Sequence, residues 1–247
     1  MIVANLATYP PRRRNLMRVV ADIAPQVDRL NVILNQYDRV PEALSAFGNV
    51  VPLIPGEDTK DTGKFYPDVS GAQWVFMVDD DILYPADFIA RTLRLARETG
   101  IDRFCAGYHG SLYLRRPKPK YLLRPRRYVR EAKKRMGERR HVFSAHRALR
   151  RSTIVEQIAT NAAVMPASLF PGYEYMKGSK QFVDVRLARW CHENDIACIC
   201  LKRPKGYLKT VSFEESIFKG FTIHNHCHVI DEIQQFAAKV PDAGKKL

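Results

Sequence analysis

The sequence has no long hydrophobic run and no opening of the kind that directs secretion. No uninterrupted apolar segment approaches the roughly 20 residues needed to cross a bilayer. In the opening, MIVANLATYPPRRRNL, the basic cluster follows the short apolar run instead of preceding it. These absences argue against a secreted or membrane-spanning protein. They predict a cytoplasmic protein, either soluble or attached as a peripheral protein to the inner face of the membrane.

Cysteine is also scarce, with five residues in 247. An odd number argues against a complete disulfide framework. Cys198 and Cys200, in IACICLK, have a C-x-C spacing that suits one face of a strand, whereas zinc sites more often show C-x-x-C spacing. The cysteines are therefore predicted to be reduced and structural.

Acidic residues are nearly missing from residues 111–152. This segment holds 16 Lys and Arg but only two acids, Glu131 and Glu138, while the whole chain has a formal charge of +14 from 40 basic and 26 acidic residues. The rest of the chain is therefore neutral. A neutral body with one strongly basic segment is typical of a protein held near an anionic partner.

The remaining residues alternate between strand and helix patterns. Short apolar runs predict strands at 1–7, 28–36, 49–54, 72–79, 102–108 and 196–202. Helical periodicity predicts helices at 10–26, 41–47, 85–100, 180–195 and 229–240, with a short basic helix at 128–140. This rhythm predicts an α/β fold with a mainly parallel, doubly wound sheet, into which residues 111–152 are inserted as a basic loop and helix.

The stretch WVFMVDDDILYP, residues 74–85, ends a predicted buried strand in three aspartates. Ligands of open α/β sheets bind outside the carboxyl ends of the strands. Asp81 or Asp87 has the simpler role of capping the helix that follows, but one acid is enough for that. Three adjacent carboxylates repel one another, and a hard divalent cation such as Mg²⁺ or Mn²⁺, shared with a substrate diphosphate, offsets the repulsion. If the strand continues, Asp79 and Asp81 lie on the same side.

The segment FMVDDDILYPADFI resembles the metal-binding D-x-D region of GT-A glycosyltransferases, particularly family 2 relatives. IVANLATYPPRRRNL, DTKDTGKF and KQFVDVRLARWCHENDI resemble, in the same order, the family's first strand and loop, its nucleotide-contacting loop and its acceptor-side helix. The resemblance covers most of the chain outside 111–152. It implies one GT-A catalytic domain over residues 1–247, with a nucleotide-sugar-binding half at 1–110 and an acceptor-binding half at 153–247.

The resemblance also implies roles for individual residues. The residues expected to contact the donor are Thr8, Tyr9, Arg12, Asp61, Lys64, Asp79 and Asp80. Asp79 and Asp81 are expected to hold Mn²⁺ or Mg²⁺, and His224 or His226, in FTIHNHCHVI, to complete the metal shell. Asp184 matches the catalytic base of inverting members, although Val183 stands where the family usually has a second acid. A helix cap or a surface acid is the simpler interpretation of Asp184.

The implied activity is transfer of a sugar from a nucleotide-diphosphate sugar, most simply a UDP-sugar, to a hydroxyl group of a glycan or lipid-linked acceptor in surface-polysaccharide synthesis. A nucleotidyltransferase is an alternative, but its glycine-rich phosphate loop is missing from NLATYPPRRRN. A non-enzymatic adaptor for membranes or nucleic acid is another. The basic segment itself has three interpretations, whichever function holds: a solvated loop, a surface for anionic lipid or acceptor, or, with less support, a nucleic-acid site, since no nucleic-acid module is recognised.

Overall fold

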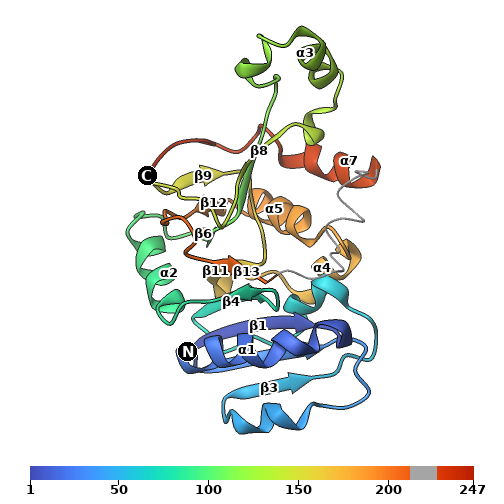
Figure 1. The fold of residues 1–247 in the computed structure, drawn as a ribbon, viewed down its shortest axis with the longest axis vertical. Helices are drawn as coiled ribbons and strands as arrows, with labels where there is room; N and C mark the ends of the chain where they lie inside the picture. The colour runs from blue at the N-terminus through green and yellow to red at the C-terminus, as the bar shows by residue number, and fades with distance from the viewer. Residues whose placement is uncertain (212–226) are drawn as a thin grey trace.

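The computed structural model describes residues 1–211 and 227–247, and its centre is an eight-stranded sheet with the order β3-β2-β1-β4-β11-β6-β12-β9 (Figure 1). In that order the strands are Val50–Leu53, Arg29–Leu34, Ile2–Thr8, Trp74–Asp79, Ala162–Pro166, Phe104–Gly107, Ala197–Cys200 and Thr153–Val155. β3, β2, β1 and β4 pair in parallel, as do β6 and β12. β11 runs antiparallel to both of its neighbours, and β9 is antiparallel to β12.

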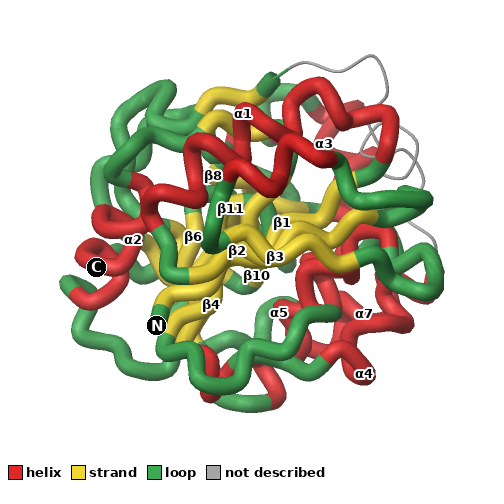
Figure 2. Tube along the Cα trace, turned by 90° about the horizontal axis from the view of Figure 1, so that it is seen from below, coloured by secondary structure: helices red, strands yellow, loops and turns green. Residues whose placement is uncertain are grey.

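Helices cover both faces of this sheet, because its strands alternate two sets of buried side chains (Figure 2). α1 (Arg13–Ile23) and α2 (Phe88–Arg97) pack on the face that carries Leu6 and Phe76. α5 (Val183–Glu193) packs on the opposite face, which carries Met77 and Cys198. The prediction of a mainly parallel, doubly wound α/β fold is confirmed.

The remaining elements are short. The other α-helices are α3 (Pro125–Ala132), α4 (Tyr173–Met176) and α7 (Cys227–Phe236). The 3-10 helices are η1 (Pro10–Arg12), η2 (Ala24–Gln26), η3 (Glu42–Ala46), η4 (Lys60–Phe65), η5 (Pro119–Tyr121), η6 (Met136–Glu138), η7 (Ala167–Leu169) and η8 (Lys177–Ser179). The segment 55–67, which reads as a polar loop, thus contains η4, and the short helix expected at 41–47 is the 3-10 helix η3.

Residues 111–152 are more ordered than a loop with one helix. Two small sheets flank the central one: β10 (Gln157–Ile158), β7 (Gly110–Tyr113) and β8 (Arg140–Phe143) form one, and β13 (Lys209–Thr210) and β5 (Ile82–Leu83) form the other. β7 and β8 are an antiparallel pair, and η5, α3 and η6 lie between them in the chain. The basic helix expected at 128–140 begins earlier, at Pro125, and ends at Ala132, since Lys133–Arg135 leave the helix before η6.

The five cysteines are all free, as predicted, and only Cys227 is exposed. Cys198 and Cys200 lie on one face of β12, as their spacing indicates. Within residues 1–211 and 227–247, no helix combines the length and the apolar character that a bilayer crossing requires.

Candidate active site

The three aspartates lie where β4 ends, in the middle of the sheet. β4 pairs in parallel with β1 on one side and antiparallel with β11 on the other, so the strand direction changes here. Asp79 is the last residue of β4, and Asp80 and Asp81 form a turn to β5. Because the strand stops at Asp79, strict alternation does not extend to Asp81. The acids thus occupy the carboxyl edge at which open α/β sheets bind ligands.

Arg12 is the cation beside Asp80. Its Nη1 donates to Asp80 Oδ1 over 2.6 Å and lies 3.5 Å from Asp81 Oδ2. Arg12 comes from η1, where two prolines open a tight turn directly after β1. Burial would lower the pKa of Arg12, but the charge and hydrogen bond of Asp80, together with the charges of Asp81 and Asp79, raise it. The guanidinium is therefore a permanent positive charge at this edge.

The Asp80 side chain is only 2% exposed. Burial raises its pKa, while Arg12 and then Thr8 oppose that rise. Thr8 is the buried last residue of β1, and the Tyr9 ring lies 5.6 Å from the Arg12 guanidinium. The structure thus brings Thr8, Tyr9 and Arg12 together with Asp80.

Lys64 faces Asp79 from the other side of the strand end. Its side chain is 4% exposed, and its Nζ forms an ion pair with Asp79 Oδ1. The same Nζ donates to the carbonyl oxygen of Thr160 over 3.0 Å and lies 3.3 Å from Thr160 Oγ1. Burial would lower the pKa of Lys64, but Asp79 raises it. Lys64 thus joins η4 to β4 and to Thr160 in the loop before β11.

The backbone of η4 is fixed so that Lys64 reaches inward. The side-chain amide of Asn5 donates to the Lys64 carbonyl over 2.7 Å, and Asn31, its partner across β1 and β2, donates to Asn5 over 2.8 Å. A Cβ on Gly63 would stand 2.6 Å from Thr59 Oγ1. The glycine therefore allows η4 to lie directly against the sheet.

Asp184 lies in the first turn of α5, but it does not cap that helix, whose N-cap is Phe182. Its Oδ1 accepts hydrogen bonds from the backbone N–H of Thr160 over 2.8 Å and from Thr160 Oγ1 over 3.0 Å. Burial raises the pKa of Asp184, while the Thr160 N–H and then Lys64 oppose the rise. Thr160 therefore connects Asp184 to Lys64.

Asp61 completes the acidic group. Its Oδ1 accepts the backbone N–H of Gln181 over 2.7 Å, which ties η4 to the entry of α5. Burial raises the pKa of Asp61 to about 6, and the charge of Asp184 adds to this, while the Gln181 hydrogen bond and Lys64 oppose it. Asp61, Lys64 and Asp184 are thus brought together although 120 positions separate Asp61 from Gln181.

Tyr84 supports the strand end and was not predicted. Its hydroxyl accepts the Asp79 backbone N–H over 2.8 Å and donates to the Asn161 carbonyl over 2.6 Å. This holds the Asp79 backbone against the residue before β11. The only signal in the sequence is that a buried tyrosine usually finds a partner for its hydroxyl.

In the part of the chain that the structure describes, the five carboxyl groups named above are balanced by two cations, Arg12 and Lys64. Burial and then the charge of Asp79 raise the pKa of Asp81 to about 7, although Arg12 opposes this. The carboxylates of Asp79 and Asp81, whose side chains are 28% and 25% exposed, offer hard oxygen donors. Such donors fit a divalent cation that also binds a diphosphate. The described residues contain no group of three or more acids, histidines or cysteines arranged to hold a metal by themselves. His224 and His226 lie outside the described residues.

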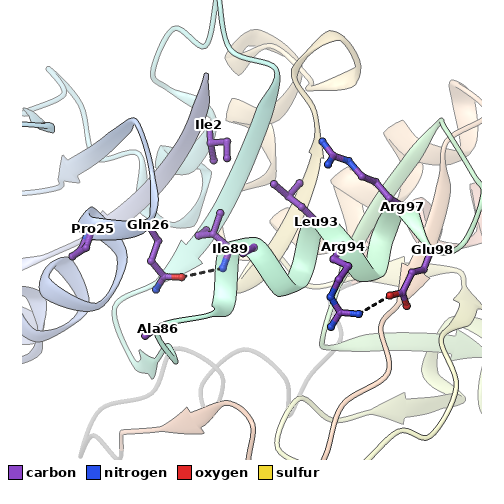
Figure 3. A pocket seen from close by; sticks show the side chains of 10 residues that line it. Ile2, Pro25, Gln26, Ala86, Ile89, Leu93, Arg94, Arg97 and Glu98 are labelled. Atoms are coloured by element: carbon purple, nitrogen blue, oxygen red, sulfur yellow. Dashed lines mark hydrogen bonds and ion pairs between the residues drawn. The ribbon is translucent and has the colours of Figure 1, made fainter.

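A hollow of about 670 Å³ lies at the opposite edge of the sheet (Figure 3). Ile2, which opens β1, lines it together with Ile89 and Leu93 of α2. Two of the charged residues that line it, Arg94 and Glu98, form an ion pair over 2.5 Å. None of the residues predicted for the site lies there.

No protein-family model and no curated protein matches the chain. Among solved structures, it is similar to the crystal structure of S. aureus TarS 1-349, with a TM-score of 0.53, 11% identity, and coverage of 85% of this chain and 60% of that one. The TarS 1-349 structure in complex with UDP-GlcNAc gives a TM-score of 0.51 and 9% identity over 89% of this chain and 61% of that one. The chain thus spans about three fifths of these TarS chains. At this identity the likeness shows the fold, a Rossmann-like α/β fold of the GT-A type.

Proposed function

We propose that this chain is a metal-dependent glycosyltransferase that transfers a sugar from a UDP-sugar to a hydroxyl group of a glycan or lipid-linked acceptor. The observation that carries the proposal is the network at the carboxyl end of β4, where Lys64 joins Asp79 to Thr160 and Thr160 binds Asp184. The similarity to TarS, whose structure has been solved with UDP-GlcNAc, supports a nucleotide-sugar donor. Surface-polysaccharide synthesis is the setting we propose.

The donor side of the reaction needs positive charge, because the bond between the anomeric carbon and a phosphate oxygen breaks and the diphosphate leaves as an anion. Asp79 and Asp81 would hold Mn²⁺ or Mg²⁺, which when bound supplies Lewis-acid stabilisation of that anion. Arg12 lies beside the same acids and adds a fixed positive charge. Thr8 and Tyr9 line the adjoining end of β1, where the base and ribose would bind.

The acceptor side of the reaction needs a base. Both hydrogen bonds from Thr160 use Oδ1 of Asp184. No described residue donates a hydrogen bond to its Oδ2, and this oxygen would take the proton of the attacking hydroxyl group. Burial raises the pKa of Asp184 and so increases its basicity. Direct attack on the anomeric carbon with this base inverts its configuration.

Donor binding and metal dependence can be tested together. We expect UDP-GlcNAc or another UDP-sugar, in a panel with GDP-, CDP- and TDP-sugars, to raise the unfolding temperature of the protein when Mn²⁺ is present and much less in EDTA. The variants Asp79→Asn and Asp81→Asn should lose this metal-dependent shift. If no nucleotide sugar shifts the wild type under either condition, and none is hydrolysed, the proposal is wrong.

A further inference from the structure

The most exposed aliphatic side chains of the described residues lie in the basic helix α3 or directly before it. Leu123 is 90% exposed, Leu122 is 62% exposed and Val129 is 53% exposed. None of the residues of α3 is buried. Exposed leucines at adjacent positions lose the free energy that burial would provide, and contiguous apolar surface of this kind marks an interaction site.

These side chains lie within the densest positive charge of the chain. Residues 115–135, which we name the basic tip, contain eleven Lys and Arg against a single acid, Glu131. Glu131 is paired with Lys134 over 2.8 Å. Arg124, Arg126 and Lys133 are exposed and make no ion pair with any described residue. The basic tip therefore has cations available for an external anion.

The basic tip is attached to the rest of the protein at one end, and its helix α3 is exposed to solvent. β7 and β8 carry it, and the Leu114 N–H donates to the Arg139 carbonyl over 2.8 Å just beyond the paired strands. The Cα of Gly137 packs so closely on α7 that an added Cβ would lie 3.2 Å from Ile233. Arg135 forms an ion pair with Asp231 of α7. In Figure 1, α3 projects beyond α7 at the end of the molecule farthest from β3.

We infer that the basic tip is a docking surface for anionic lipid bilayers. Leu122 and Leu123 enter the boundary between headgroups and acyl chains, and the surrounding arginines and lysines bind lipid phosphates. A nucleic acid or a soluble polyanion would bind the same cations, but it has no apolar phase in which the exposed leucines could be buried. The combination of both chemistries on one projecting element is what favours a bilayer.

The two contributions act together. Each Lys or Arg near an anionic surface contributes on the order of 1 kcal/mol, and this part weakens with salt. The leucines contribute through apolar area, which salt does not screen. Binding should therefore require anionic lipid and should also depend on the leucines. The inference does not rest on the proposed transferase activity, because the tip carries none of the site residues.

The test is co-sedimentation of the wild type with vesicles. Vesicles of phosphatidylcholine containing about 30% phosphatidylglycerol should bind the protein, and pure phosphatidylcholine should not. The double variant L122S/L123S keeps every charge and should bind the anionic vesicles about tenfold less tightly. The matched control is V40S/I54S, which removes two aliphatic side chains that are each 42% exposed elsewhere, and it should bind like the wild type.

The charge contribution is tested in the same way. R124Q/R126Q should weaken binding several-fold, whereas R150Q/R151Q, which removes two exposed arginines outside the basic tip, should have a smaller effect. Single-stranded DNA serves as the competing ligand. If the wild type binds DNA but not anionic vesicles, or if L122S/L123S binds vesicles as tightly as the wild type, the inference is wrong.

Insertion can be measured directly. Brominated phosphatidylglycerol vesicles should quench the tryptophan fluorescence of L123W more strongly than that of the wild type. The wild type's own tryptophans provide the background signal. V40W should show no added quenching. An L123W protein that binds the vesicles without added quenching would contradict insertion. UDP-sugar thermal shifts should be the same in all these tip variants, so a failure here is distinguishable from a failure of the proposed function.

Discussion

At the scale of single residues, Lys64 determines the charge balance of the site. Its ammonium group is almost fully buried and pairs with Asp79, and its charge also opposes the rise in the pKa of Asp61 and Asp184. Asp80 pairs with Arg12 instead. Removing one partner of a buried ion pair leaves an uncompensated charge, which is more costly than losing the attraction alone.

Lys64→Met should destabilise the protein by about 2–4 kcal/mol in EDTA, less than for a fully enclosed pair because the Asp79 side chain is 28% exposed. Urea unfolding measures this, and Lys60→Met, an exposed lysine on the same η4 helix, is the matched control. Mn²⁺ should stabilise the Lys64 variant more than the wild type, because Asp79 then lacks its cation. A variant as stable as the wild type would mean that the pair contributes nothing.

Asp61 makes the stability of the protein depend on pH. Its pKa rises from an ordinary 3.8 to about 6 in the folded state, so the folded protein binds this proton more tightly than the unfolded chain. The associated stability is complete below about pH 4 and is lost as the pH rises through about 6.

Asp61→Asn removes this dependence and keeps an oxygen for the Gln181 N–H. The variant should be more stable than the wild type by about 1–3 kcal/mol at pH 7.5. At about pH 4 the two should be nearly equal. Urea unfolding at both pH values measures the difference. An equal difference at both values would contradict the raised pKa.

Sequence patterns located the acids and cations but not their pairing. A strand ending in acids indicates a ligand edge, and this applies to Asp79, Asp80 and Asp81 alike. Their separation, with Asp80 turned to Arg12 and Asp79 to Lys64, depends on the point where β4 stops. Lys64 meets Thr160 across 96 positions, a contact that no local pattern contains.

At the scale of elements, the antiparallel strand β11 lies very close to β6 at Gly107. A Cβ on Gly107 would lie 2.8 Å from the Ala162 carbonyl oxygen and 2.9 Å from Ile158. Since Ala162 follows the site loop that contains Thr160, space at this glycine also affects the position of the site.

Gly107→Ala should therefore destabilise the protein by about 1–3 kcal/mol through overpacking. Gly48→Ala is the matched control, because nothing lies within 4 Å of its added Cβ and it should be neutral or gain up to about 1 kcal/mol. Thermal unfolding compares the two. If the two variants unfold at the same temperature, an added methyl group at Gly107 costs no stability, and the close approach of β6 and β11 is not required.

The parallel half of the sheet was predictable because β1, β2, β3 and β4 are apolar runs separated by helical patterns or turns. The other half was harder to predict. The insertion of β11 between β4 and β6 is decided by pairing of residues far apart in sequence. β8 was hidden by its polar residues Arg140 and His141, which lie in a small sheet next to the main one.

At the scale of the whole molecule, the positive charge is separated from the proposed chemistry. The proposed catalytic network uses residues of β4, η4, α5 and the loop before β11, whereas the excess charge lies on the element carried by β7 and β8. A transferase that docks on a membrane needs its donor site to work without the tip, while an adaptor would have no function without it.

Replacing residues 119–130 by a Gly/Ser linker of about six residues separates these cases. The change removes η5, most of α3 and five basic residues, but it leaves the Lys134 carbonyl bound to Arg139 and Arg135 paired with Asp231. Because no residue of α3 is buried, the unfolding temperature should change little. The Mn²⁺-dependent shift by a UDP-sugar should persist, and binding to anionic vesicles should be lost. If the sugar-dependent shift vanishes while the fold remains, the tip takes part in donor binding, and the separation of charge from chemistry is wrong.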